Sequence, residues 1–104
     1  ATIRQRYFLD KNDLWHLKSS VTGLVSFARH DLMRDALPQV QDLVCCRYLV
    51  FTYYKGRRRQ EVEQRLHKAM RPGGALMVGR KEKLPLSYPF FEPWQMTKGI
   101  FRKI

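Results

Sequence analysis

A strand, a helix, a Pro-Gly-Gly turn and a second strand follow one another in the middle of this sequence. Residues 43–46 are apolar on both faces, a pattern typical of a strand that is covered on each side. Residues 57–70 place their apolar side chains on one helical stripe, and residues 71–74 should end that helix with a left-handed glycine cap. Residues 75–79 form the second apolar run. Such a unit joins parallel strands, so the sequence predicts an α/β fold.

The segments before this unit carry weaker patterns. Residues 4–17 mix aromatic and charged side chains around a turn signal at residues 10–13, which predicts a hairpin or a loop. Residues 19–24 indicate a short helical turn, and residues 25–29 alternate apolar and other side chains as a strand would. A loop is expected at residues 31–41.

The chain beyond residue 46 should first turn, or form a short helix, near Arg47. Residues 88–94 are rich in aromatic side chains and proline, and residues 99–104 are apolar and basic. We expect a C-terminal antiparallel strand pair in which the prolines occupy an edge or a loop. No repeat or low-complexity linker interrupts the sequence, so residues 1–104 are predicted to form a single domain.

The chain is strongly basic. It has 20 Lys and Arg against 9 Asp and Glu, which gives a formal net charge of +11. A positive field of this size attracts nucleic acid, an anionic membrane or an acidic protein surface. The basic residues could equally line a solvated face, or balance acidic residues that lie outside this sequence. Charge alone leaves these alternatives open.

Two adjacent cysteines bear on the cellular compartment. Neighbouring residues of a strand point to opposite faces, so a disulfide between Cys45 and Cys46 would be strained, and we expect two reduced, buried thiols. That state suits the cytoplasm, where disulfides are rare. The histidines have no zinc-ligand spacing, so no metal site is predicted. Without a signal sequence or an apolar run of ~20 residues, we expect a soluble, cytoplasmic protein with no membrane span.

Several segments are more informative in their exact residues than in their apolar patterns. Residues 25–32 read V-S-F-A-R-H-D-L, residues 42–51 read D-L-V-C-C-R-Y-L-V-F, and residues 71–79 read R-P-G-G-A-L-M-V-G. In the same order, with residues 59–70 read before the third, they resemble the V-x-F-x-x-x-N-L, D-L-I-F-C-R-N-V-L-I-Y-F and L-x-x-L-x-P-G-G-x-L-x-L-G segments of chemotaxis-receptor methyltransferases of the CheR type. Residues 91–93 and 101–103 also look like the last strands of that family. The resemblance implies the C-terminal half of such an enzyme, with a partial Rossmann-like methyltransferase sheet.

The resemblance also implies methyl transfer from S-adenosylmethionine to receptor glutamate carboxylates. Asp31 stands where the family usually has an Asn near the adenine, and Leu32 follows it. Arg47 matches the family's Arg after the central strand, where it could reach the donor and the incoming carboxylate, and Tyr53 lies one place beyond the family's Tyr. These four residues are the cofactor-binding candidates, and no catalytic residue is assigned. A loop or capping role for Asp31 and an ion pair for Arg47 are the structural alternatives.

Two replacements and one absence limit what the resemblance carries over. Tyr48 replaces the family's Asn, and Thr52 replaces its Tyr. The sequence contains no glycine-rich turn from a strand into a helix, because Gly73 and Gly74 follow a helix and precede a strand. The donor's amino-acid end and its ribose therefore lack the glycine turn and the acidic residue that the family supplies. We expect a truncated or degenerate fragment that is inactive alone and binds S-adenosylmethionine weakly or not at all.

The expected partner is the missing N-terminal half or a second copy of the chain. A strand at residues 25–29 would have no inherited neighbour, and bare strand edges pair with other chains. The alternative function is a stand-alone basic module that binds RNA or an acidic protein, with Lys and Arg on phosphates and aromatic rings under bases. Tight binding of the donor favours the first function, and salt-sensitive binding of single-stranded nucleic acid favours the second.

Overall fold

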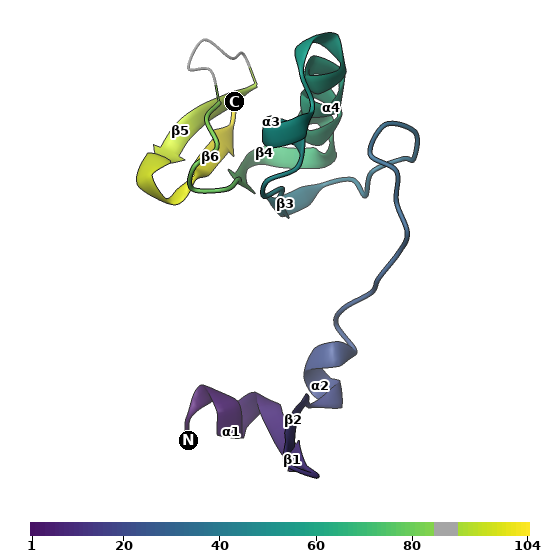
Figure 1. The fold of residues 1–104 in the computed structure, drawn as a ribbon, viewed down its shortest axis with the longest axis vertical. Coiled ribbons are helices and arrows are strands. Elements are labelled where there is room, and N and C mark those ends of the chain that lie inside the picture. The colour runs from purple at the N-terminus through teal and green to yellow at the C-terminus, as the bar shows by residue number, and fades with distance from the viewer. Residues whose placement is uncertain (85–89) are drawn as a thin grey trace. The chain divides into compact units, whose positions relative to one another are not determined.

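The computed structural model describes residues 1–84 and 90–104. Two units, Ala1–His30 and Asp31–Ile104, are each packed within themselves. Figure 1 shows the helices and strands of both units along the chain. The single-domain assignment stays a prediction.

The larger unit is built on a four-stranded mixed sheet. Its strands are β3 (Gln41–Cys45), β4 (Met70–Met77), β5 (Phe91–Gln95) and β6 (Ile100–Lys103), in the spatial order β3-β4-β6-β5 (Figure 1). β3 and β4 are parallel, whereas β6 is antiparallel to both β4 and β5. This arrangement confirms the α/β fold, with two parallel core strands and a C-terminal antiparallel pair.

A helical connection links the two parallel strands, as predicted. The short helix α3 (Val50–Tyr53) follows β3, and α4 (Gly56–Ala69) then runs to the start of β4. The predicted glycine cap is wrong, because α4 ends at Ala69 and Met70 is already extended, with φ of −99°. β4 therefore begins before Pro72, and its register to β3 shifts between Gln41 and Leu43.

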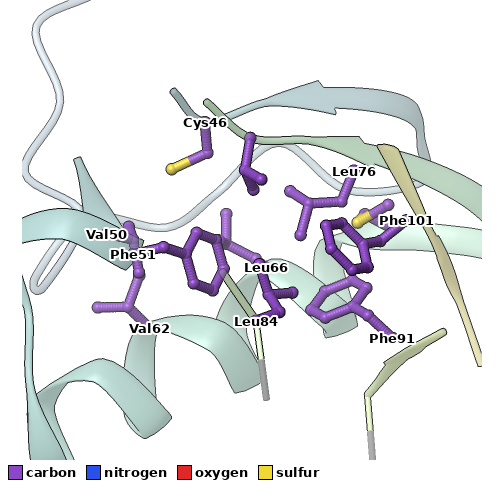
Figure 2. Packing of buried hydrophobic residues seen from close by; sticks show 11 residues of the cluster. Cys46, Val50, Phe51, Val62, Leu66, Leu76, Leu84, Phe91 and Phe101 are labelled. Atoms are coloured by element: carbon purple, nitrogen blue, oxygen red, sulfur yellow. The ribbon is translucent and has the colours of Figure 1, made fainter. Parts of the chain in front are cut away.

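One face of the sheet packs against α4. Val62 and Leu66 of the helix are buried, and they meet Leu76 of β4 and two phenylalanines of the C-terminal strands. Figure 2 shows the rings of Phe91 and Phe101 beside Leu76, with Leu66 reaching toward them from the helix. The helical stripe deduced from the sequence is thus the stripe that forms the core.

A buried ion pair lies on the same helix. Arg59 Nε donates to Glu63 Oε1 at 2.7 Å, and the Glu63 side chain is fully buried. The Arg59 guanidinium also lies 5.4 Å from the centre of the Phe51 ring. Within residues 1–84 and 90–104, Glu63 Oε2 has no hydrogen-bond partner, so this carboxylate depends on Arg59 for its charge compensation.

The other face of the sheet is open in the part of the chain that the structure describes. Leu43 is 52% exposed and Cys45 is exposed, so the described residues cover β3 on one face and not on both as expected, and the expected burial of Cys45 is wrong. Only Val44 of β3 packs toward the core. β3 has one neighbour, β4, among the described strands, which leaves its second edge without a strand.

The C-terminal strand pair is confirmed for residues 91–103. A 3₁₀ turn, η1 (Met96–Lys98), joins β5 to β6 and ends at Gly99, which has φ of +69°. A Cβ at Gly99 would lie 2.7 Å from the Val78 carbonyl oxygen, so this turn requires glycine. Pro93 lies on β5, an edge strand, as its missing N–H demands. The proline at position 89 lies outside the described residues.

The smaller unit confirms the hairpin but not the strand that should follow it. α1 (Ile3–Tyr7) precedes the antiparallel pair β1 (Phe8–Lys11) and β2 (Leu14–Leu17), and α2 (Ser19–Thr22) comes next. Asn12 and Asp13 both have positive φ, the backbone of a two-residue hairpin turn. The predicted strand at residues 25–29 is wrong, because the segment is irregular and Phe27 is 95% exposed. An alternating pattern forms a strand only beside a neighbour, and the described residues supply none.

No helix in residues 1–84 and 90–104 is long and apolar enough to cross a membrane. The same residues contain no group of three or more His, Cys, Asp or Glu that could hold a metal ion.

Candidate functional site

The carboxyl ends of β3 and β4 lie side by side, because the strands are parallel and Cys45 pairs with Met77. In open α/β sheets, ligands bind outside this edge of the strands. Two segments leave the sheet there, residues 46–49 after β3 and residues 78–82 after β4. This edge is therefore the place where a candidate site has to be built.

Arg47 stands at this edge, two residues beyond β3. Its side chain is exposed, and its guanidinium lies 5.7 Å from the centre of the Tyr48 ring. Arg47 belongs to none of the four ion pairs of the described residues, so the structural alternative of an ion pair is not the one seen. A free guanidinium at this edge can attract a carboxylate or another anion.

Tyr48 takes an unusual conformation next to Arg47. Its φ is +53°, a left-handed value that non-glycine residues seldom adopt. Its ring occupies the space that a side chain at Gly79 would need, since a Cβ there would lie 2.5 Å from Tyr48 Cζ. The residue that replaces the family's Asn is thus packed against the end of β4.

Asp31 lies in a turn that uses its side chain. Its Oδ1 accepts from the backbone N–H of Met33 at 2.9 Å, and its own N–H donates to Asp35 Oδ2 at 2.7 Å. An exposed ion pair of 3.9 Å joins it to Arg34. These contacts are those of the structural alternative, a loop aspartate, although the carboxylate is about half exposed. A role in donor binding stays a prediction.

Leu32 is held by a residue that the sequence did not single out. It packs against the core, and its carbonyl oxygen accepts from Arg65 Nη1 of α4. Arg65 Nη2 donates to the carbonyl oxygen of Asp35, so one guanidinium fixes the loop at two points. A basic residue on the outside of a helical stripe gives no sign of this role, because its partners are backbone atoms about 30 residues away.

Tyr53, the fourth candidate, lies at the surface. It lies on α3 and is 72% exposed. No hydrogen bond or ion pair in residues 1–84 and 90–104 joins Asp31, Arg47 and Tyr53 to one another. Its neighbour Thr52 is engaged instead, because the hydroxyl donates to a carboxylate oxygen of Glu82.

Glu82 was not predicted, yet it connects most of this edge. Its carboxylate accepts from the backbone N–H groups of Tyr48 and Gly79 as well as from the Thr52 hydroxyl. The one available signal is that Glu82 is the single acidic residue in the basic run of residues 80–83. Cys46 is buried beside this carboxylate, and burial in the first place, with the negative charge of Glu82 in addition, raises the pKa of its thiol.

An apolar cavity of about 360 Å³ lies on the open face of the sheet, away from these polar groups. Its lining comes from four elements and includes Leu43, Met77, Trp94 and Ile100. It offers no cluster of hydrogen-bonding groups for the ribose or amino-acid end of a donor. It is the kind of surface that an apolar segment covers.

Comparison with known proteins identifies the family. Residues 1–100 match the family model described as CheR methyltransferase, SAM binding domain. The chain belongs to the CheR methyltransferase family. It is 30% identical over 103 residues to a chemotaxis protein methyltransferase of Vibrio parahaemolyticus, a match that covers 97% of the chain and 37% of that relative. It is 28% identical over 81 residues to one from Listeria innocua, covering 78% of the chain and 30% of that relative.

A third relative, an uncharacterized 104.1 kDa protein of Rhodobacter capsulatus, is 30% identical over 84 residues, or 81% of the chain and 9% of that protein. The CheR-type chain thus spans about a third of the length of the chemotaxis methyltransferases it matches. S-adenosylmethionine is the donor named for the family's domain. The described residues contain no glycine-rich turn from a strand into a helix, and roles for Arg47 and the Asp31 loop in binding such a donor stay predictions.

Proposed function

We propose that these residues form the carboxyl-terminal part of the donor site of a CheR-type protein-glutamate methyltransferase. In this proposal the chain binds S-adenosylmethionine weakly or not at all until a polypeptide with the amino-terminal part of the site joins it. That polypeptide could be a further segment of the same protein or a separate chain. The observation that carries the proposal concerns β3, a parallel strand that has an exposed apolar face and, among the described residues, no strand on its second edge.

The physical reason lies in how parallel sheets are built. Parallel strands are normally central and covered on both faces, because helical crossovers lie above and below the sheet. β3 instead exposes Leu43, and the adjoining cavity is lined almost wholly by apolar side chains. A strand beside β3 and a covering helix would remove both exposures. The same added strand could bring a glycine turn to the edge at which Arg47 lies.

Charge favours a complementary segment over a second copy of the chain. Each copy carries +11, so two copies repel each other, and neither contains a glycine-rich turn from strand to helix. An acidic or neutral segment meets no such repulsion. The amino-terminal part is therefore the partner that we propose.

In the proposed enzyme, S-adenosylmethionine supplies an electrophilic methyl group, and the acceptor is a glutamate carboxylate. Arg47 attracts a carboxylate at the strand ends, either that of the donor or that of the acceptor. The loop at Asp31, held by Arg65, forms the wall on the adenine side. Proton removal is not demanded of these residues, since a carboxylate acceptor is already ionised near neutral pH.

Calorimetric titration of two proteins tests the proposal. The first is the chain alone, and the second is a chimaera in which the chain replaces the matched segment of the Vibrio parahaemolyticus relative. Loss of two anchoring groups predicts binding by the chain alone that is weaker on the order of a thousandfold than binding by the chimaera. Arg47→Ala should weaken binding by the chimaera about tenfold, whereas Arg57→Ala, which removes an exposed charge from α4, should not.

Two results would overturn the proposal. A folded chimaera that does not bind the donor would show that the chain's strand ends do not form such a site. Micromolar binding by the chain alone would show that these residues already contain the whole site. Salt-sensitive binding of labelled single-stranded RNA, with no donor binding in either protein, would support the basic binding module instead.

A further inference from the structure

One carboxylate joins three segments at the edge of the sheet. Glu82 Oε1 accepts from the Tyr48 N–H at 2.6 Å and from the Gly79 N–H at 2.7 Å, and Oε2 accepts from Thr52 Oγ1 at 2.6 Å. The Glu82 N–H in turn donates to the Gly79 carbonyl oxygen at 2.9 Å. The segment after β3, the helix α3 and the segment after β4 are thereby held by a single side chain.

We call these three hydrogen bonds to the Glu82 carboxylate the clasp, and their geometry is that of strong hydrogen bonds. Hydrogen bonds to an ionised carboxylate are shorter and stronger than those between neutral groups, and the distances of 2.6 to 2.7 Å fit that class. The bond to the Tyr48 N–H also offsets the energetic cost of the left-handed backbone at Tyr48. Without that bond, the backbone would relax to a less strained conformation. The absence of a side chain at Gly79 lets the Tyr48 ring lie directly on the backbone at the end of β4.

The clasp reaches Arg47 through the Tyr48 ring. The Arg47 guanidinium lies 5.7 Å from the centre of that ring, within the range of a cation–π contact. Arg47 has no ion pair among the described residues, so the Tyr48 ring is the side chain that supports its guanidinium there. A change in the Tyr48 turn would therefore change where the guanidinium points.

We propose that Glu82 is a positioning residue, which fixes the Tyr48 turn and thereby holds Arg47 toward the methyl donor. This inference rests on the proposed function, because it takes Arg47 as a donor-binding group. Glu82 itself does not touch the ligand. Both of its carboxylate oxygens already accept hydrogen bonds from the protein, three in all, of the roughly four that an ionised carboxylate can accept.

The first measurement uses the chain alone and needs no donor. Nuclear magnetic resonance of the backbone amides should show that Glu82→Ala shifts the Tyr48 and Gly79 resonances and raises their hydrogen-exchange rates about tenfold or more. Glu82→Gln, which keeps an acceptor oxygen, should give an intermediate result. Glu61→Gln alters an exposed carboxylate on α4 and should leave both amides unchanged. Unaltered Tyr48 and Gly79 amides in Glu82→Ala would overturn the clasp.

The second measurement separates positioning from a merely structural effect. In the chimaera, Glu82→Ala and Arg47→Ala should each weaken donor binding about tenfold, and the double variant should be no weaker than Arg47→Ala alone. Residues that act through one another are non-additive in this way. Additive losses would mean that Glu82 does not act through Arg47, and they would overturn the inference.

Controls keep the two proposals apart. If Glu82→Ala fails to fold, Glu82→Gln and Thr52→Val provide the same cycle with smaller changes. Normal donor binding by the unmodified chimaera, with additive losses in the variants, overturns the positioning role alone. A folded, unmodified chimaera that binds no donor overturns the proposed function, and the role of Glu82 toward a donor falls with it.

Discussion

The two faces of the four-stranded sheet differ in how completely they are built. On the face toward α4, Leu76, Phe91 and Phe101 are at most 4% exposed and pack against Leu66. On the other face, Leu43 and Trp94 are each about half exposed. The comparison indicates that the packing energy of this unit comes from the α4 face, while the open face is free to serve an interaction.

The covered face should be sensitive to a buried charge, and this is the largest effect that we expect. Leu66→Asp places an unpaired carboxylate among the side chains of the core and should lower the free energy of unfolding by about 4 kcal/mol. Leu43→Asp introduces the same charge on the open face and should cost less than about 1 kcal/mol. Urea unfolding followed by circular dichroism measures both. Equal losses would mean that the open face is covered in solution.

The same pair of variants also tests the proposed partner. In the chimaera, the face at Leu43 should be covered, so the cost of Leu43→Asp should rise toward that of Leu66→Asp. A small cost in both proteins would argue against covering of this face by the amino-terminal part.

The buried ion pair should give the next largest effect. Arg59→Met keeps the apolar stem beside Phe51 but leaves the Glu63 carboxylate buried without compensation, which should cost about 3 kcal/mol. Arg58→Met, an exposed neighbour on α4, should change stability by less than about 0.5 kcal/mol. Thermal unfolding of the two variants decides this, and similar melting temperatures would show that Glu63 finds another partner.

The sequence was most informative where local spacing decides the structure. The stripe at Val62 and Leu66 predicted α4 and its buried side, and the apolar runs on either side of it predicted β3 and β4. Whether the second face of β3 is buried could not be predicted from Leu43 and Cys45. An apolar side chain shows that a position can be covered, but not that another element covers it. The pattern at residues 25–29 failed for a related reason, since a strand depends on a neighbour that these residues do not contain.

The candidate site was harder to predict because its contacts are distant in sequence. The family resemblance suggested Arg47 and the Asp31 loop as candidates, but it gave no sign that Arg65 and Glu82 hold those segments in place. Glu82 is 34 residues from Tyr48, and in the sequence it looks like one acidic residue in a basic run. Residues that position a site through backbone hydrogen bonds carry no motif, and only the folded chain brings them together.

The smallest expected difference between the two faces concerns the two cysteines and the pH dependence of stability. Burial raises the pKa of the Cys46 thiol above its usual value of 9.0, so the folded protein holds this proton more tightly than the unfolded chain does. The stabilising contribution is complete below about pH 9, and it is lost as the pH rises through the raised pKa of the folded state. Cys46→Ala removes the contribution together with some packing.

Cys46→Ala should therefore lower stability by roughly 1 kcal/mol at pH 7, and its deficit against the natural protein should shrink as the pH rises above about 9. Other groups also titrate in this range, so the difference between the two proteins is the informative quantity. Cys45→Ala removes the exposed thiol of the open face and leaves no cavity, which makes it the matched control. Urea unfolding at several pH values gives these differences. The deficit of Cys46→Ala should not stay constant from pH 7 to 10, and it must change more than the Cys45→Ala difference does. Either failure would mean that the Cys46 thiol reaches water. The packing over this end of β3 would then be looser than a covered face requires.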